Sequence, residues 1–232
     1  MTIRLPGALA LDARLLETMR AENGDIAHLG RHLDRLSKSA TRLGYPLDRV
    51  EADRLARSAA LRAAPDTARV RLTLGPRGDL DVIHAPLLDT SFETAWIDPL
   101  PLAEAGTPRC TLKTTDRDHY ATRLDRARAV GADEAILVNA QGEVTEGTRT
   151  NVWADIDGRL WTPPSTSGGL PGVLRAHLIA TDARAGERVL TPADLWAAEA
   201  LFLSNAVRGL MRVHLVEGSP GTPLGDSPDA SS

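Results

Sequence analysis

The chain is poor in several features that define common classes of protein. Its single cysteine, Cys110, cannot form an internal disulfide, and a zinc site of four cysteines is impossible. No apolar run approaches the ~18 residues of a membrane-spanning helix. The net charge is −4, whereas a nucleic-acid-binding protein usually carries a basic excess. Residues 1–12 lack the basic segment and apolar core of a secretory signal, so we expect a cytoplasmic protein that binds neither nucleic acid nor membrane.

Lysine is also scarce. Of the 27 basic residues, Lys38 and Lys113 are lysines and the rest are arginines. Arginine does not lose its proton in a protein, whereas lysine can. Any chemistry that needs a neutral amine must therefore use one of these two side chains.

The histidines do not suggest a metal site. His28 and His32 are four residues apart, but the glutamate of a His-Glu-x-x-His motif is missing between them. We therefore expect no bound metal.

The first half of the chain mixes strand patterns with amphipathic helices. Apolar residues at steps of four and three predict a helix over residues 29–43 that ends at Gly44. A second helix is expected between Asp48 and Pro65. Strands are expected in residues 8–22, 70–74, 80–84 and 92–97.

The second half begins with a helix, predicted from Asp118 to Val130 and followed by Gly131. A loop rich in serine, glycine and proline, residues 162–172, precedes another predicted helix, Val173–Arg184. Strands are expected in residues 135–138, 144–154 and 201–203.

The length of 232 residues fits one large domain or two small ones, given a typical domain of ~150 residues. A proline-containing stretch that ends near Pro108 separates the two halves. We therefore expect an N-terminal α/β domain (1–102), a linker (103–110), a C-terminal α/β domain (111–217) and a disordered tail (218–232), which is rich in glycine, serine and proline.

Two residues of the second half could carry chemistry. Lys113 lies between the linker and a helix, where an amine with a lowered pKa could form a Schiff base with a carbonyl compound. The alternative is a solvated lysine at the start of a helix. Glu146 precedes Gly147, and a carboxylate there could pair with the nitrogen of a pyridinium ring. The alternative is an exposed glutamate in a hairpin.

Two further features could bind phosphate. Arg35 lies beside the apolar stripe of the first helix, and its planar guanidinium suits an anion, although surface ion pairs would explain it equally well. The glycine-rich loop ends at Gly172 and leads into a helix, whose first backbone N–H groups can bind phosphate. A plain turn into a helix is the alternative.

Taken in chain order, these pieces resemble the class IV aminotransferases, a family of pyridoxal-phosphate enzymes of fold type IV. The resemblance extends from about Leu15 to Val216, and residues 113–175 carry its most specific motifs. The matching segments contain Arg35, Lys113–Tyr120, Glu146–Asn151, Leu170–Arg175 and Ser204–Gly209.

The resemblance implies pyridoxal 5'-phosphate as cofactor and a role for individual residues. Lys113 corresponds to the Schiff-base lysine, Glu146 to the glutamate that pairs with the pyridine nitrogen, and Arg35 to the phosphate-binding arginine. Tyr120 corresponds to a tyrosine near the phenolate oxygen of the cofactor. The backbone positions against the phosphate are Val173 and Leu174 at a helix start, and Asn205 and Ala206 at a turn.

The resemblance also implies the fold and the assembly. The fold class is α/β, with two mixed α/β domains that hold the cofactor in the cleft between them. The protein is then expected to form a homodimer and to act on a small molecule.

Three local motifs resemble the aminodeoxychorismate lyase branch of the family. They surround Thr18, which is expected to assist proton transfer, Lys113, and Arg208. Arg20 and Arg208 are candidates for binding substrate carboxylates, with structural salt bridges as the alternative. The expected reaction converts 4-amino-4-deoxychorismate to 4-aminobenzoate and pyruvate, a step of folate biosynthesis.

Two other interpretations remain open. An aminotransferase of the D-amino-acid or branched-chain type would use the same lysine and glutamate. A non-catalytic, arginine-rich binding protein is disfavoured by the interspersed acidic residues.

Overall fold

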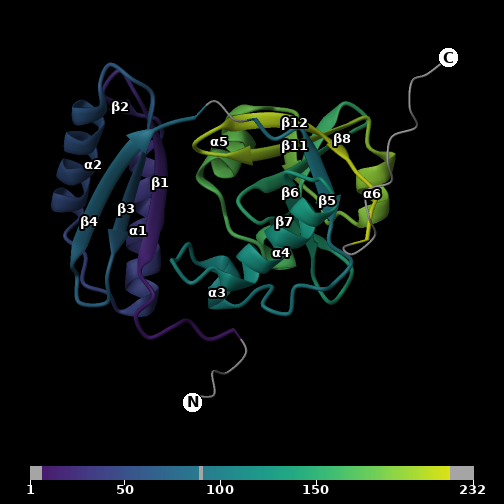
Figure 1. Cartoon of the computed structure of the whole chain (residues 1–232), viewed down its shortest axis with the longest axis horizontal. Helices are drawn as coiled ribbons and strands as arrows, with labels where there is room; N and C mark the ends of the chain where they lie inside the picture. The colour runs from purple at the N-terminus through teal and green to yellow at the C-terminus, as the bar shows by residue number, and fades with distance from the viewer. Residues whose placement is uncertain (1–6, 89–90, 220–232) are drawn as a thin grey trace.

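Two β-sheets lie side by side along the long axis of the molecule (Figure 1). The computed structural model describes residues 7–88 and 91–219. Within these residues, one sheet has four strands and the other has eight. In the same part of the chain, no helix is both long enough and apolar enough to cross a membrane.

The four-stranded sheet is antiparallel and packs against two helices. Its strands, in spatial order, are β2 (Asp25–Ile26), β1 (Leu15–Glu22), β3 (Ala68–Leu74) and β4 (Leu80–Pro86). The helices are α1 (Leu29–Leu43) and α2 (Arg49–Ala63). Because side chains alternate between the faces of a strand, Met19 and Leu72 point to the helices and join one apolar core with Leu33. The other face of the sheet carries Thr18 and Arg20 of β1 and Arg69 and Arg71 of β3, whereas Glu17 faces α1.

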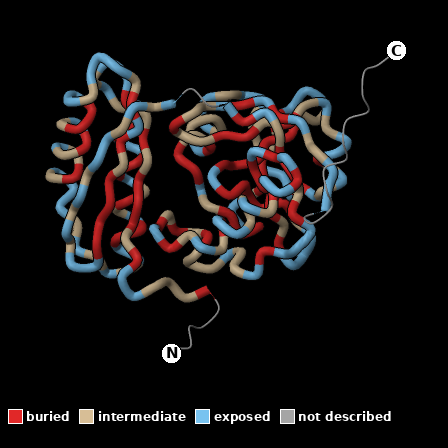
Figure 2. Tube along the Cα trace, in the orientation of Figure 1, coloured by how far each residue is buried: buried red, intermediate tan, exposed pale blue. Residues whose placement is uncertain are grey.

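The eight-stranded sheet is mixed. Its spatial order is β10 (Ala185–Glu187), β9 (Arg159–Thr162), β8 (Asn151–Ile156), β11 (Ala200–Asn205), β12 (Gly209–Leu215), β5 (Thr94–Ile97), β6 (Glu134–Val138) and β7 (Val144–Gly147). Its helices are α3 (Pro108–Thr111), α4 (Asp118–Ala129), α5 (Val173–Thr181) and α6 (Pro192–Ala197), with a 3-10 turn η1 (Ser165–Ser167). Figure 2 shows that buried residues follow the strands of both sheets.

Strand β5 lies in the larger sheet, not in the N-terminal half as expected. It pairs in parallel with β12 and β6, and these partners are distant in sequence. The chain therefore passes from one sheet to the other between β4 and β5, and not in residues 103–110. Part of that expected linker is helical and forms α3. The division into domains thus stays a proposal, with this earlier crossing point.

The expected strand over residues 144–154 is interrupted. Glu134 is fully buried, and its carboxylate accepts backbone N–H groups from Thr148 and Arg149 at 3.0 and 3.1 Å. These bonds turn the chain between β7 and β8. The carboxylate comes from another strand, so a local pattern could not reveal the break.

Other elements also differ from the expectation. The helix that begins at Val173 ends at Thr181, and residues 185–187 form β10 instead of continuing it. Strand β12 and helix α6 were not predicted. Residues 220–232 of the expected disordered tail lie outside the described residues. Gly218 is described, and its carbonyl accepts a hydrogen bond from Trp96 Nε1 at 2.9 Å.

A short backbone contact joins the two sheets. The N–H of Leu16 donates to the carbonyl of Lys113 at 2.9 Å, and Leu15 pairs with Thr114 as an isolated bridge. The N–H of Thr115 donates to the carbonyl of Arg14 at 2.9 Å. The backbone of the Lys113 segment is therefore held along β1.

A buried carboxylate holds α4 against the end of β5. The side chain of Asp98 is fully buried and accepts hydrogen bonds from Arg123 at 2.9 Å and from Arg126 at 3.1 Å. Its Oδ1 also accepts the N–H of Leu100 at 3.0 Å. Four donors thus converge on one carboxylate.

Replacing Asp98 with alanine should therefore destabilise the protein by roughly 3 kcal/mol, because it removes the partner of two partly buried arginines. The matched control is Asp125→Ala, which breaks an exposed pair with Arg128 on α4. The control should change stability by less than about 0.5 kcal/mol. Urea unfolding of both variants measures the difference, and equal effects would contradict the anchoring role of Asp98.

Candidate active site

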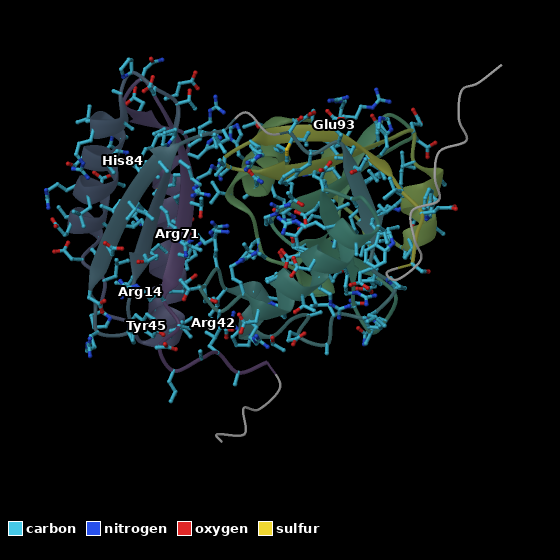
Figure 3. The ribbon with its side chains drawn as sticks, viewed as in Figure 1. Arg14, Arg42, Tyr45, Arg71, His84 and Glu93 are labelled. Atoms are coloured by element: carbon cyan, nitrogen blue, oxygen red, sulfur yellow. The ribbon has the colours of Figure 1, made fainter. Side chains whose placement is uncertain are left out.

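A cavity of about 260 Å³ lies between the two sheets. Figure 3 shows the side chains that fill this region, with Arg71 on the side of the smaller sheet that faces the larger one. The smaller unit contributes side chains from β1, β3 and α1. The larger unit contributes residues from four segments, namely 110–120, 146–151, 170–174 and 204–208.

Lys113 lies in the wall of this pocket and is half-buried. Its pKa is lowered to about 7, mainly because the amine loses hydration and also because Arg117 and Arg35 add positive charge. A substantial share of the Lys113 amines is then neutral near pH 7, whereas an ordinary lysine is almost fully charged there. A neutral amine is the nucleophilic form.

Glu146 is the buried carboxylate of the pocket. Its Oε1 accepts a hydrogen bond from the hydroxyl of Tyr120 at 2.5 Å, and its Oε2 accepts the N–H of Leu170 at 3.1 Å. Burial raises the pKa of Glu146 to about 7, although both hydrogen bonds and the charges of Arg117 and Lys113 oppose the rise. Glu146 is therefore not the exposed hairpin glutamate that the sequence left open.

Tyr120 supports this carboxylate from α4. Burial and the nearby charge of Glu146 raise the pKa of Tyr120 well above its usual value, so the hydroxyl keeps its proton and donates it. The guanidinium of Arg117 lies 4.5 Å from the centre of the Tyr120 ring. In the structure, Tyr120 thus orients Glu146; its expected place beside the cofactor phenolate stays a prediction.

Arg35 lines the pocket but is also paired with a buried carboxylate. Its Nε and Nη2 donate to Glu17 at 2.8 and 2.6 Å, and its Nη1 donates to the carbonyl of Pro171 at 3.3 Å. Burial alone would raise the pKa of Glu17, but the charge of Arg35 and hydrogen bonds from His32 and Arg35 lower it to about 2. A guanidinium has five N–H donors, so this pairing leaves others for an anion.

The loop before α5 brings backbone N–H groups to the pocket. Val173 and Leu174 lie in the first turn of α5, where N–H groups have no partner within the helix and favour anions. A Cβ atom at Gly172 would collide with Oδ1 of Asn151, whose Nδ2 holds the carbonyl of Leu170 at 2.9 Å. Only glycine allows the loop to approach this closely.

A second turn faces the same space from the end of β11. Oδ1 of Asn205 accepts the N–H groups of Val207 at 3.0 Å and Arg208 at 2.8 Å. This bonding closes the turn and places Asn205, Ala206 and Arg208 along the pocket.

The structure brings together nearly all of the residues that the sequence analysis selected. Thr18 lines the pocket and lies directly opposite Arg71 on β3. Arg20 does not line it, because its guanidinium pairs with Glu22 on the same face of β1 at 3.2 Å. The salt-bridge alternative describes this contact, and a role of Arg20 in binding substrate stays a prediction.

Three arginines of the pocket were missed by the sequence analysis. Arg69 and Arg71 alternate with buried apolar residues of β3, a pattern that indicates a polar face but not what that face meets. Arg149 lies in the turn between β7 and β8 that was not predicted. The sequence signal for Arg69 and Arg71 was their spacing of two residues, which puts both on one face of a strand. The structure adds that Arg69 lies opposite Arg20 and Arg71 opposite Thr18.

The groups around this cavity fit a phosphorylated pyridine aldehyde. They are an amine that can be neutral, a buried carboxylate and two turns whose backbone N–H groups can bind an anion. The amine can bond to the aldehyde, the carboxylate can hold the pyridinium proton, and the turns can bind the phosphate. This donor set defines the class of site found in pyridoxal-phosphate enzymes.

The comparison with known families supports the same class of site. Residues 14–216 match the model of the amino-transferase class IV family, and the chain belongs to this family. The fold class, the pyridoxal-phosphate cofactor and the expectation that the protein is a pyridoxal-phosphate-dependent enzyme are thereby confirmed.

Individual relatives are similar over most of the chain. A Schizosaccharomyces pombe protein named "Putative aminodeoxychorismate lyase" is 33% identical over 72% of this chain and 74% of its own. A solved structure of a "Putative amino-acid aminotransferase" from Mesorhizobium loti is 36% identical, with a TM-score of 0.81 over 88% of this chain and 100% of its own. The PLP-bound form of a hypothetical aminotransferase from Mycobacterium tuberculosis is 25% identical, with a TM-score of 0.76 over 90% and 84%.

Replacing Lys113 with arginine should abolish covalent attachment of pyridoxal phosphate, because arginine keeps the charge but cannot become a neutral nucleophile. The matched control is Lys38→Arg on the exposed side of α1, which should retain full attachment. Borohydride reduction followed by peptide mass mapping measures the adduct. Attachment in Lys113→Arg, or its loss in Lys38→Arg, would assign the site to another residue.

Attachment should also depend on pH through Lys113. The pKa of this amine is lowered to about 7, so its neutral fraction grows as pH rises through 7. In the Lys38→Arg variant, the initial rate of attachment should increase between about pH 5 and about pH 9, with a midpoint near 7. A midpoint near 10, the range of an ordinary lysine, would mean that burial does not activate the amine.

Proposed function

We propose that this protein is an aminodeoxychorismate lyase, which converts 4-amino-4-deoxychorismate to 4-aminobenzoate and pyruvate. The observation that carries the proposal is the charge of the pocket. Lys113 and six arginines line it, whereas Glu146 is the one carboxylate that does so among residues 7–88 and 91–219. The arginines are Arg35, Arg69, Arg71, Arg117, Arg149 and Arg208.

The charge of the pocket matches the charge of this substrate. The substrate carries two carboxylates, and a guanidinium can bind a carboxylate through two parallel hydrogen bonds. A branched-chain amino acid has one carboxylate and an apolar side chain, which gains little from a wall of arginines. Tyr120 is the one aromatic ring that lines the pocket within the described residues, so little ring surface is available for such a side chain.

The reaction balances without a second substrate. The ring carbon that bears the amine loses a proton, and the bond from the ring to the enolpyruvyl oxygen breaks with its electrons going to that oxygen. The released enolate then gains one proton at its methylene carbon to become pyruvate. Bound pyridoxal phosphate supplies an electron sink at the carbon that bears the amine.

Two side chains of the pocket can move these protons. Lys113 has a pKa near neutrality and can therefore take the ring proton near pH 7 as a general base. Either Lys113 or the hydroxyl of Thr18, which lines the pocket from β1, returns a proton to the methylene carbon of the enolate. The carboxyl group of Glu146 would pair with the pyridine nitrogen of the bound cofactor and keep that nitrogen protonated.

The second candidate function is an aminotransferase. The likeness to the Mesorhizobium loti aminotransferase favours it, at 36% identity and a TM-score of 0.81. It would use the same Lys113, Glu146 and Arg35 but requires an amino acid and a 2-keto acid. The likeness to the Schizosaccharomyces pombe relative supports the lyase instead. A homodimer in the cytoplasm remains part of the proposal, and light scattering of the purified protein measures its mass.

A paired assay separates the two functions. With 4-amino-4-deoxychorismate alone, the protein should release pyruvate and 4-aminobenzoate in equal amounts, because the reaction needs no amino acceptor. The second arm offers amino acids with 2-oxoglutarate and should yield little glutamate. The Lys113→Arg variant is the blank for both arms. Amino transfer without pyruvate release would replace the lyase with the aminotransferase.

A further inference from the structure

Two buried ionisable side chains of the smaller unit lie next to the pocket without lining it. They are Glu17 on β1 and His32 on α1. Glu17 binds both His32 and Arg35, and Arg35 does line the pocket. Burying a charge is costly, and apolar residues of similar volume often replace a buried ion pair without loss of stability. A group of this kind beside the pocket therefore calls for a role other than folding.

Glu17 holds one edge of the Arg35 guanidinium. Its Oε1 accepts the Nε–H of Arg35 at 2.8 Å, and its Oε2 accepts an Nη2–H at 2.6 Å. Two such parallel bonds fix the plane of a guanidinium. The Nη1 group donates to the carbonyl of Pro171 at 3.3 Å, in the loop that leads into α5. The guanidinium of Arg35 is thus held between β1 and the loop before the first turn of α5.

His32 in turn holds Glu17, because its Nδ1 lies 2.7 Å from Oε2 of that carboxylate. Burial alone would raise the pKa of Glu17, but Arg35 and His32 lower it to about 2, so the carboxylate is ionised near pH 7. An ionised carboxylate only accepts hydrogen bonds, and Nδ1 of His32 therefore carries the hydrogen and donates it. Nε2 of His32 is buried and has no hydrogen-bond partner among residues 7–88 and 91–219. Within these residues, the ring is oriented by its bond to Glu17.

We propose that Glu17 and His32 are positioning residues, which fix the guanidinium of Arg35 so that it receives the phosphate of the cofactor. Through Arg35 they let the protein distinguish pyridoxal phosphate from unphosphorylated pyridoxal. Arginine has a long, flexible side chain, and bonds that exist before the cofactor binds reduce the entropy lost in ordering it. The role goes beyond the proposed function, because a lyase and an aminotransferase of this family use the same cofactor.

Charge and positioning predict opposite effects for the loss of Glu17. As a charge, Glu17 cancels part of the positive charge of Arg35, so its removal alone would strengthen the attraction of an anion. As a positioning group, it holds the guanidinium in place, so its removal weakens the binding of a phosphate. The direction of the change in a Glu17→Gln variant therefore decides between the two roles.

A comparison of two forms of the cofactor tests the positioning role on the full-length protein. Pyridoxal phosphate and pyridoxal differ only in the phosphate, and the absorbance of the adduct with Lys113 gives the dissociation constant of each. Burial lowers the pKa of Lys113 to about 7, so measurements at about pH 9 keep its amine mostly neutral. Glu17→Gln should weaken pyridoxal phosphate about tenfold, the loss of about one charge-assisted hydrogen bond, and should change pyridoxal by less than about twofold.

Variants of His32 keep the test decisive if Glu17→Gln folds poorly. Asparagine places an amide N–H near the position of Nδ1, whereas leucine has no donor. His32→Leu should weaken pyridoxal phosphate about threefold or more and spare pyridoxal, and His32→Asn should restore most of the affinity. The matched control is Asp34→Asn, which breaks an exposed pair with Arg49 beside Arg35 on α1 and should change neither affinity.

A double-mutant cycle shows whether Glu17 acts through Arg35. Arg35→Gln alone should weaken pyridoxal phosphate at least as much as Glu17→Gln does and should spare pyridoxal. Adding Glu17→Gln to Arg35→Gln should then change neither affinity further, because the guanidinium that Glu17 holds is gone. Three results would overturn the positioning role: tighter or unchanged binding of pyridoxal phosphate in Glu17→Gln, equal loss of both forms in a variant that circular dichroism shows to be folded, or full additivity in the cycle.

Discussion

Burial of an amine and a carboxylate in one pocket is the constraint on which the chemistry of this protein depends. Loss of hydration lowers the pKa of Lys113 and raises the pKa of Glu146, so both reach about 7 from opposite sides. Each can then gain or lose a proton at neutral pH at little cost. Tyr120 and the N–H of Leu170 hold the carboxylate in place, and Arg117 keeps the amine from becoming fully charged.

The architecture serves this constraint because the pocket needs walls from both sheets. The smaller sheet supplies Thr18 and Arg69, and the larger unit supplies Lys113, Glu146 and the phosphate-binding turns. The backbone bond between Leu16 and Lys113 keeps the lysine against β1. Further bonds from Thr115 to Arg14 and from Arg35 to Pro171 also join the two units beside the pocket.

Features with a local signal could be predicted from the sequence. The apolar spacing of α1, its end at Gly44 and the importance of Lys113 among two lysines all follow from neighbouring residues or from simple counts. Features that depend on contacts between residues far apart in the sequence could not be predicted. The pairing of β5 with β12 and the inward direction of Arg69 arise only when separate parts of the chain meet. The pairing of Arg20 with Glu22 on the same face of β1 was one of two alternatives that the sequence left open for Arg20.

A crystal structure of the protein with pyridoxal phosphate tests the central claim most directly. The expected result is a covalent bond from the aldehyde carbon to Nζ of Lys113, the pyridine nitrogen within hydrogen-bond reach of Glu146, and the phosphate against the N–H groups of Val173 and Ala206. A cofactor bound with its phosphate away from Val173 and Ala206, or with its ring nitrogen away from Glu146, would contradict the account. Either outcome would show that burial of the two groups serves another purpose.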